Sequence, residues 1–239
     1  MTSLQLDPEN LRLGKRVLTL RLRRSKRAKR LILRLAPGEE ALILTLPPGV
    51  SREQGVAFVQ RQEDWIEQRL AQLSHRVPFA EGAFLPLLGE MHEIRHAPEA
   101  RRGVWREEGC LWVSGSPEHL PRRVKDFLRE EARELLRARA REKWNLLPAR
   151  SARPLGRISV RDTTSRWGSC SSAGNLNFSW RLILAPEPVF DYAVAHEVAH
   201  LVHMNHSKDF WKLNDQLTPD MKGARRWLRE QGASLLRYG

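Results

Sequence analysis

The sequence predicts an α+β protein with two regions: a β-rich N-terminal region that carries one helix, residues 1–118, and a catalytic region of helices and mixed sheet, residues 119–239. Short apolar runs separated by Gly- and Pro-containing turns fill the first region, a pattern typical of strands. The second region opens with a long charged segment that carries an apolar stripe, which indicates an amphipathic helix. The 239 residues suffice for one domain, or for two small ones that share a core.

In the N-terminal region, three apolar or alternating runs predict the first strands, at 17–20, 31–33 and 41–44. Ser51 and Gln54 have the spacing of a capping box, so we expect a helix from Ser51 to about Leu73. Four further runs predict strands at 84–88, 92–96, 104–105 and 111–113.

In the second region, helical patterns predict segments at 121–145, at about 188–203 and at 207–236, the last with a break at 218–219. The first of these begins with Pro121, a residue that favours the first turn of a helix. Two strands are expected between the first and second helices, at 158–161 and 175–180.

The composition excludes several classes of protein. No run approaches the roughly 18 apolar residues that a membrane-spanning helix needs, so we expect no membrane partner. The N-terminal residues show no basic segment followed by an apolar stretch, so we expect no secretory signal. Two distant cysteines, Cys110 and Cys170, form no disulfide framework. The sequence therefore predicts a cytoplasmic protein.

The net charge of +13, from 41 Lys and Arg against 28 Asp and Glu, favours contact with polyanions. The densest basic block is Arg21–Arg30, RLRRSKRAKR. It fits a solvated strand and turn as well as it fits a surface that binds nucleic acid or nucleotides, so both interpretations stay open.

Histidines and a glutamate in one short segment carry the clearest chemical signal. His196 and His200 enclose an HExxH motif, and residues four apart share one face of a helix, so both imidazoles can bind one ion. Glu197 is then placed to reach a metal-bound water. The neighbouring residues are mostly apolar, and burying these polar groups is costly without a metal or hydrogen-bond partners. The alternatives are a surface helix with incidental histidines and a purely structural zinc site, which normally has four protein ligands.

The third ligand is His203 or His206. In a straight helix the Cα of His203 lies about 10.5 Å along the axis from that of His196, a poor geometry for a tetrahedron. His206 reaches the ion if the helix ends first, and Asn205 is suited to a left-handed residue that ends a helix. We therefore expect Zn²⁺ to be held by His196, His200 and His206, with His203 beside them as a support or alternative ligand.

Three neutral ligands leave one coordination position open, which is typical of a hydrolytic zinc site. Glu197 is expected to act as general base toward the metal-activated water and then to protonate the leaving group. The expected function is a zinc-dependent metallohydrolase that cleaves peptide bonds. A nucleotide phosphoanhydride hydrolase (pyrophosphatase) and a basic nucleic-acid-binding module are the alternatives.

Several motifs around the histidines make the pattern more specific. They are TTSRWGSCS at 163–171, GNLNFSWRL at 174–182, Asp-Tyr at 191–192, HExxH-x5-H at 196–206 and SKDFW at 207–211. Together they resemble the YgjP-like metallopeptidase family, a zincin group related to the SprT-like proteases. The resemblance covers about residues 15–236.

The resemblance implies a zincin-like core with an active-site helix and a mixed sheet, metal at His196, His200 and His206, and Glu197 as general base. It also implies a protein or peptide substrate, and an edge strand near 166–172 or 175–178 that lines the substrate cleft. Arg166 and Asn175 are the expected substrate contacts in those segments.

Overall fold

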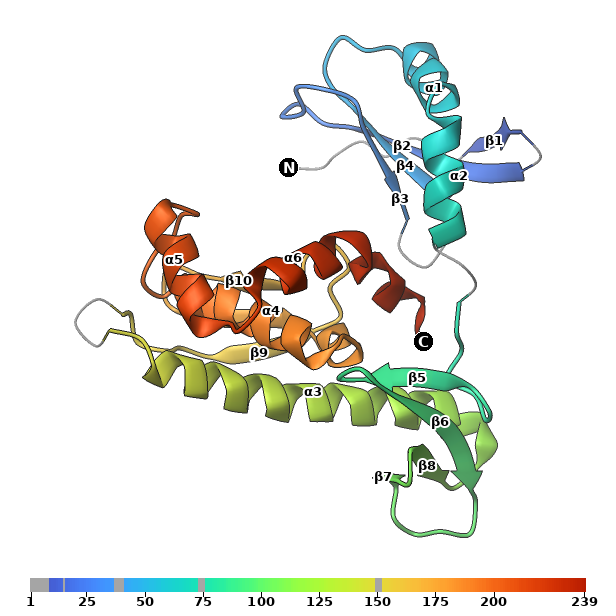
Figure 1. The fold of residues 1–239 in the computed structure, drawn as a ribbon. Coiled ribbons are helices and arrows are strands. Elements are labelled where there is room, and N and C mark those ends of the chain that lie inside the picture. Colours follow the sequence, from blue (N-terminus) through green and yellow to red (C-terminus); the bar gives the residue numbers. More distant parts are fainter. Residues whose placement is uncertain (1–8, 15, 37–40, 73–75, 149–151) are drawn as a thin grey trace. The chain divides into compact units, whose positions relative to one another are not determined.

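The computed structural model describes residues 9–14, 16–36, 41–72, 76–148 and 152–239 (Figure 1). It confirms the α+β class, with helices and mixed sheets. The chain divides into two compact units, Met1–His75 and Arg76–Gly239. Among the described helices, none combines the length and the apolar character needed to cross a membrane.

The first unit contains a four-stranded sheet in the order β1-β2-β4-β3, in which β2 and β4 are parallel. Its strands are β1 (Glu9–Leu13), β2 (Arg16–Arg24), β3 (Ile32–Leu35) and β4 (Ala41–Leu46). Alternate leucines of β2 and β4 are buried in one core with Val59 and Ile66 of the helices.

The single helix predicted after Ser51 is two helices, α1 (Arg52–Gln60) and α2 (Glu63–Gln72). The predicted capping box is present: the Gln54 amide donates to Ser51 Oγ at 3.2 Å, and the Ser51 amide donates to Gln54 Oε1 at 2.9 Å. The chain interrupts the helix at Arg61 and Gln62, where no residue type in the sequence signals a break.

The second unit begins with a sheet in the order β5-β6-β8-β7. Its strands are β5 (Phe84–Leu87), β6 (Glu90–Ala97), β7 (Val104–Glu107) and β8 (Cys110–Ser114). Buried side chains of this sheet, such as Ile94 and Leu111, share one core with Val124 and Leu128 of the long helix α3 (Leu120–Asn145). The division of the chain therefore falls after His75 and not at the predicted residue 118, because the sheet and α3 bury each other's apolar faces.

The helix α3 (Leu120–Asn145) matches the predicted 121–145 and follows a short 3-10 helix, η1 (Pro117–His119). A second sheet follows in the order β10-β11-β9, made of β9 (Ile158–Arg161), β10 (Gly168–Cys170) and β11 (Leu176–Ser179). The strands β9 and β11 are parallel, β10 is antiparallel to β11, and β10 is an edge strand.

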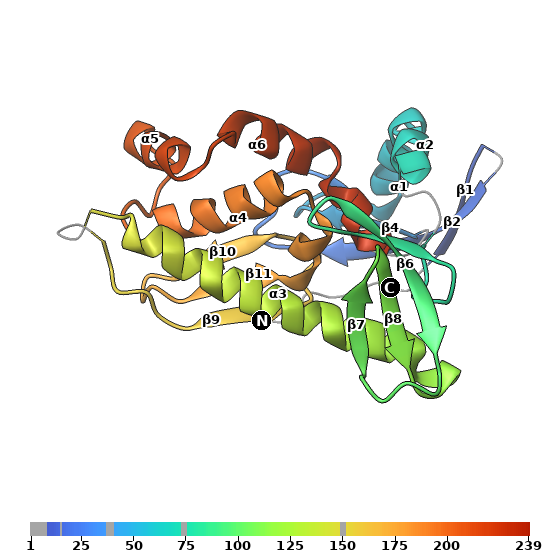
Figure 2. The same cartoon turned by 60° about the horizontal axis from the view of Figure 1, so that its bottom comes forward.

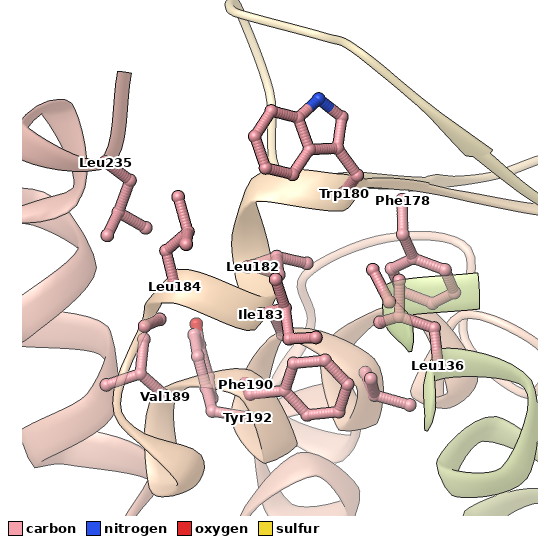
Figure 3. Close-up of a cluster of buried hydrophobic side chains, with 14 of the residues drawn as sticks. Leu136, Phe178, Trp180, Leu182, Ile183, Leu184, Val189, Phe190, Tyr192 and Leu235 are labelled. Carbon is pink, nitrogen blue, oxygen red and sulfur yellow. The ribbon is translucent and has the colours of Figure 1, made fainter. Parts of the chain in front are cut away.

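The chain then forms η2 (Trp180–Leu184), α4 (Glu187–Ala199), α5 (Lys208–Leu217), α6 (Met221–Glu230) and η3 (Gly232–Arg237). The helix α4 packs against α3, α5, α6 and β10 (Figure 2). Apolar side chains from β11, η2, α3 and α4 meet around Phe178 and Phe190 (Figure 3). Each such fully buried side chain contributes about 1.5–3 kcal/mol, so the cluster holds α4 firmly in the interior.

A buried group of charges joins α3 to α4. Asp191 and Lys143 are each 6% exposed, and Lys143 Nζ lies 2.8 Å from Asp191 Oδ2. Arg139 also pairs with Asp191, and Lys143 donates to the Leu217 carbonyl at 2.6 Å. The Asp-Tyr pair that precedes the HExxH motif thus anchors α4 through its aspartate.

We expect Lys143→Met to lower the free energy of unfolding by about 3 kcal/mol, because removing one partner of a buried ion pair leaves the other charge poorly compensated. Asp126→Asn is the control, since the ion pair of Asp126 with Arg122 on α3 is exposed and its loss should cost less than about 1 kcal/mol. Chemical denaturation followed by tryptophan fluorescence measures both. If both variants lost the same small amount of unfolding free energy, a stabilising role for the buried pair would be contradicted.

Candidate active site

The helix α4 ends at Ala199, with His200 as its C-cap, four residues before the predicted end at His203. The last turn closes through bonds from the Leu201 amide to the Val198 carbonyl and from the His203 amide to the Ala199 carbonyl. The Leu201 carbonyl accepts from the Arg153 amide at 2.9 Å, a partner that a local pattern cannot reveal. The prediction that Asn205 adopts a left-handed conformation is wrong: in the described chain, only Leu88 and Glu108 among non-glycine residues have positive φ.

This early end of the helix brings His206 back to the first two histidines. One ligand atom from each of His196, His200 and His206 lies within 4.8 Å of the others, and the Nε2 atoms of His196 and His206 are 3.1 Å apart. Nitrogen ligands on a tetrahedral zinc, at about 2.0–2.1 Å from the ion, are about 3.3 Å apart. The three imidazoles therefore fit a zinc ion with little movement.

His203 contacts the site through its main-chain carbonyl, which lies beside the ring of His200. Its carbonyl oxygen lies 2.9 Å from Nδ1 of His200, so Nδ1 of a neutral His200 donates to it and Nε2 is left for a metal. The His203 side chain is not among the described groups that converge on one point. Its position is thus that of a support for His200.

Burial controls the protonation of the site. It lowers the pKa of His196 to about 4, helped by the neighbouring His200 and His206, and it also lowers the pKa of His200. Near neutral pH the imidazoles of His196 and His200 are therefore uncharged, which is the form that binds metal. Burial raises the pKa of Glu197 to about 7, against an opposing effect of Arg166.

The carboxylate of Glu197 lies against β10. A Cβ atom added to Gly168 would lie 2.5 Å from Oε1 of Glu197, so only glycine leaves room for this carboxylate. Of the two segments predicted to provide the edge strand, 166–172 contains it, because β10 is at the edge of the sheet while β11 is central.

Of the two predicted substrate contacts, Arg166 and Asn175, only Arg166 lines a cavity. Arg166 lies near Glu197 and lines a cavity of about 250 Å³. Asn175 does not line this cavity, and its Oδ1 accepts from the Arg157 amide at 2.9 Å, which holds a turn. Asn177, two residues further along, does line the cavity.

Aromatic side chains of α5 surround the histidines. Trp211 stacks on His206 with ring centroids 5.5 Å apart and 25° between the planes, and the guanidinium of Arg225 lies 4.3 Å from the Trp211 ring centre. Phe210 stacks on His200 at 4.5 Å. Ser207 caps α5 by accepting from the Phe210 amide, which starts the helix directly after His206. In the sequence Trp211 is part of the SKDFW motif, whereas no sequence pattern marks Arg225.

Residues 29–231 match the family model described as YgjP-like, metallopeptidase domain. The chain belongs to the YgjP-like metallopeptidase family. The comparisons with curated proteins and with solved structures give no match. Membership in the family confirms the predicted resemblance and makes this YgjP-like protein a metallopeptidase, a hydrolase that uses a metal cofactor and acts on proteins or peptides.

We expect His206→Ala to weaken zinc binding by more than about a hundredfold, because it removes one of three converging nitrogens. Removing a residue that only supports a metal ligand lowers metal affinity by about 10–100-fold, so a larger loss indicates a ligand. His203→Ala keeps the carbonyl that contacts His200, so its zinc affinity should stay within about threefold of the wild type. Competition with a chromophoric chelator measures both constants. A larger loss in His203→Ala than in His206→Ala would make His203 the ligand.

We expect Trp211→Ala to weaken zinc binding by about tenfold, because the stacked ring limits the orientations of His206. Trp211→Phe keeps an aromatic face and should restore most of the affinity. The same chelator competition measures the effect, and circular dichroism of the metal-free proteins reports whether the fold is intact. Unchanged affinity in a folded Trp211→Ala protein would show that the stack does not position His206.

Proposed function

We propose that this protein is a zinc-dependent peptidase in which His196, His200 and His206 hold the metal and Glu197 is the general base. The convergence of three imidazole nitrogens beside the buried carboxylate of Glu197 supports this proposal most strongly. Three nitrogen ligands are typical of catalytic zinc. The site that they would form has a fourth position for water or substrate.

Zinc, when bound, polarises the substrate carbonyl and lowers the pKa of water. Glu197 is 7% exposed and follows the first histidine on α4, so its carboxylate is held beside the reacting atoms. It accepts the proton of the attacking water and transfers it to the leaving amine. The edge strand β10 offers unpaired main-chain groups to an extended peptide, which would align it along the site.

The N-terminal unit gives a reason to test nucleic acid as a partner of this reaction. Its turn between β2 and β3 and the adjoining end of β2 carry six exposed cations, Arg23, Arg24, Lys26, Arg27, Lys29 and Arg30. Such a cluster attracts polyanions at low ionic strength. The family match does not address nucleic acid, so DNA enters the experiment as a variable.

The decisive comparison is between zinc-loaded wild type and Glu197→Gln. Both receive unfolded protein substrates with and without single- and double-stranded DNA, and nucleoside triphosphates in parallel. We expect the wild type to cleave protein and the variant to be at least about a hundredfold slower, because general-base catalysis supplies about 10²–10⁴-fold. The variant should keep its zinc, and Glu230→Gln, which changes an exposed carboxylate of α6, should keep full activity.

Two results would contradict the proposal. Hydrolysis of nucleotides that depends on Glu197, without proteolysis, would indicate a phosphoanhydride hydrolase. DNA binding without hydrolysis of any substrate would indicate a binding module.

A further inference from the structure

The cavity beside Glu197 is rich in hydrogen-bond donors and positive charge. It has a volume of about 250 Å³, and its polar lining consists of Arg161, Thr163, Arg166, Ser169 and Asn177. Cavities that hold whole small-molecule ligands are usually about 300–1,000 Å³, so this one suits a side chain or a chain end better than a complete nucleotide.

The strand register places much of this lining on one face of the β9–β11 sheet. Ser169 of β10 is directly opposite Asn177 of β11, and Asn177 is beside Ser159 of β9. Arg161 is two residues beyond Ser159 and therefore shares its face. Gly168 alternates with Ser169 and points to the opposite face, where Glu197 lies. Arg161, Ser169 and Asn177 of the cavity thus lie on the face away from the Glu197 carboxylate. Gly168 and Phe178, which belong to the other alternating set, also line the cavity, so it borders the segment of β10 that contacts Glu197.

The two arginines of the cavity have no carboxylate partner within ion-pair distance among the described residues. Asp162, which adjoins Arg161 in the sequence, is occupied elsewhere: its Oδ1 lies 3.2 Å from Arg181 Nε and its Oδ2 lies 3.2 Å from Lys125 Nζ. Both Arg161 and Arg166 are exposed. Guanidinium groups recognise carboxylates through paired hydrogen bonds, so two arginines without an ion-pair partner at one cavity are suited to an anionic group.

We propose that this cavity is a substrate subsite that binds a carboxylate of the peptide, from an acidic side chain near the scissile bond or from the C-terminus of the peptide. This inference rests on the proposed peptidase function. A peptide extended along β10 directs successive side chains to opposite faces of the sheet. The residue that faces away from Glu197 then enters the cavity, so the preference falls on one alternate set of positions.

Arg161→Gln tests the subsite, because Arg161 lines the cavity and lies on the face away from Glu197, whereas Arg166 also influences the Glu197 carboxylate. The substrates are quenched fluorescent peptides in matched pairs, with Glu or the isosteric Gln at each position around the cleaved bond. We expect wild type to have a kcat/KM at least about tenfold higher for Glu than for Gln at one position. Arg161→Gln should abolish this preference, so that it cleaves the Glu and Gln peptides with similar kcat/KM.

Arg157→Gln is the matched control, since Arg157 is an exposed arginine that directly precedes β9 and does not line the cavity. It should keep the preference for Glu. Equal cleavage of Glu and Gln peptides by the wild type, or a preference that survives in Arg161→Gln, would overturn the subsite. A second set of peptides with a free or amidated C-terminus distinguishes the source of the carboxylate: a preference confined to the free acid assigns the cavity to the chain end.

A binding measurement separates the subsite from the peptidase function. Zinc-loaded Glu197→Gln is titrated against fluorescein-labelled Glu and Gln peptides, and anisotropy reports the affinity. Tighter binding of the Glu peptide that Arg161→Gln removes supports the subsite even if the wild type hydrolyses no peptide, a result that would defeat only the proposed reaction. If a nucleoside triphosphate displaces the Glu peptide and is itself hydrolysed in an Arg161-dependent way, the cavity binds phosphate and the inference is wrong.

Discussion

The end of helix α4 at Ala199, with His200 as its C-cap, is the constraint on which the site depends. If the helix continued, His206 would lie about 9 Å further along the axis than His200 and would not converge with His196 and His200. Instead, the Arg153 amide and the ring of His200 satisfy the carbonyls of Leu201 and His203, so the chain can turn back. One backbone turn thus converts a helical pair of histidines into a three-nitrogen site.

The interior around α4 makes this site both rigid and chemically suitable. The pairing of Asp191 with Lys143 and Arg139 ties the helix to α3, and apolar side chains enclose the rest of it. The same burial lowers the pKa of His196 to about 4 and raises that of Glu197 to about 7. Packing and protonation therefore have one physical cause, the exclusion of water from α4.

The edge strand β10 links the metal site to its surroundings. Its glycine at 168 gives room to the Glu197 carboxylate on one face, while Ser169 contributes to a cation-lined cavity on the other. A strand with alternating faces can therefore present the reacting bond of an extended peptide on one side and select its side chain on the other. In the proposed function, reaction and selection both depend on the same three-residue segment, β10.

The sequence by itself determined the features that depend on near neighbours: the limits of α3, the capping box of Ser51, and the HExxH pair on one helical face. It also carried the motifs that identified the family. Only the tertiary structure decided where α4 ends, that the first sheet of the second unit shares its core with α3, and that Asn177 rather than Asn175 lines the cavity. Helical period and capping act over about four residues, whereas the partners that decide the rest, such as Arg153 for the Leu201 carbonyl, lie tens of residues away in the chain.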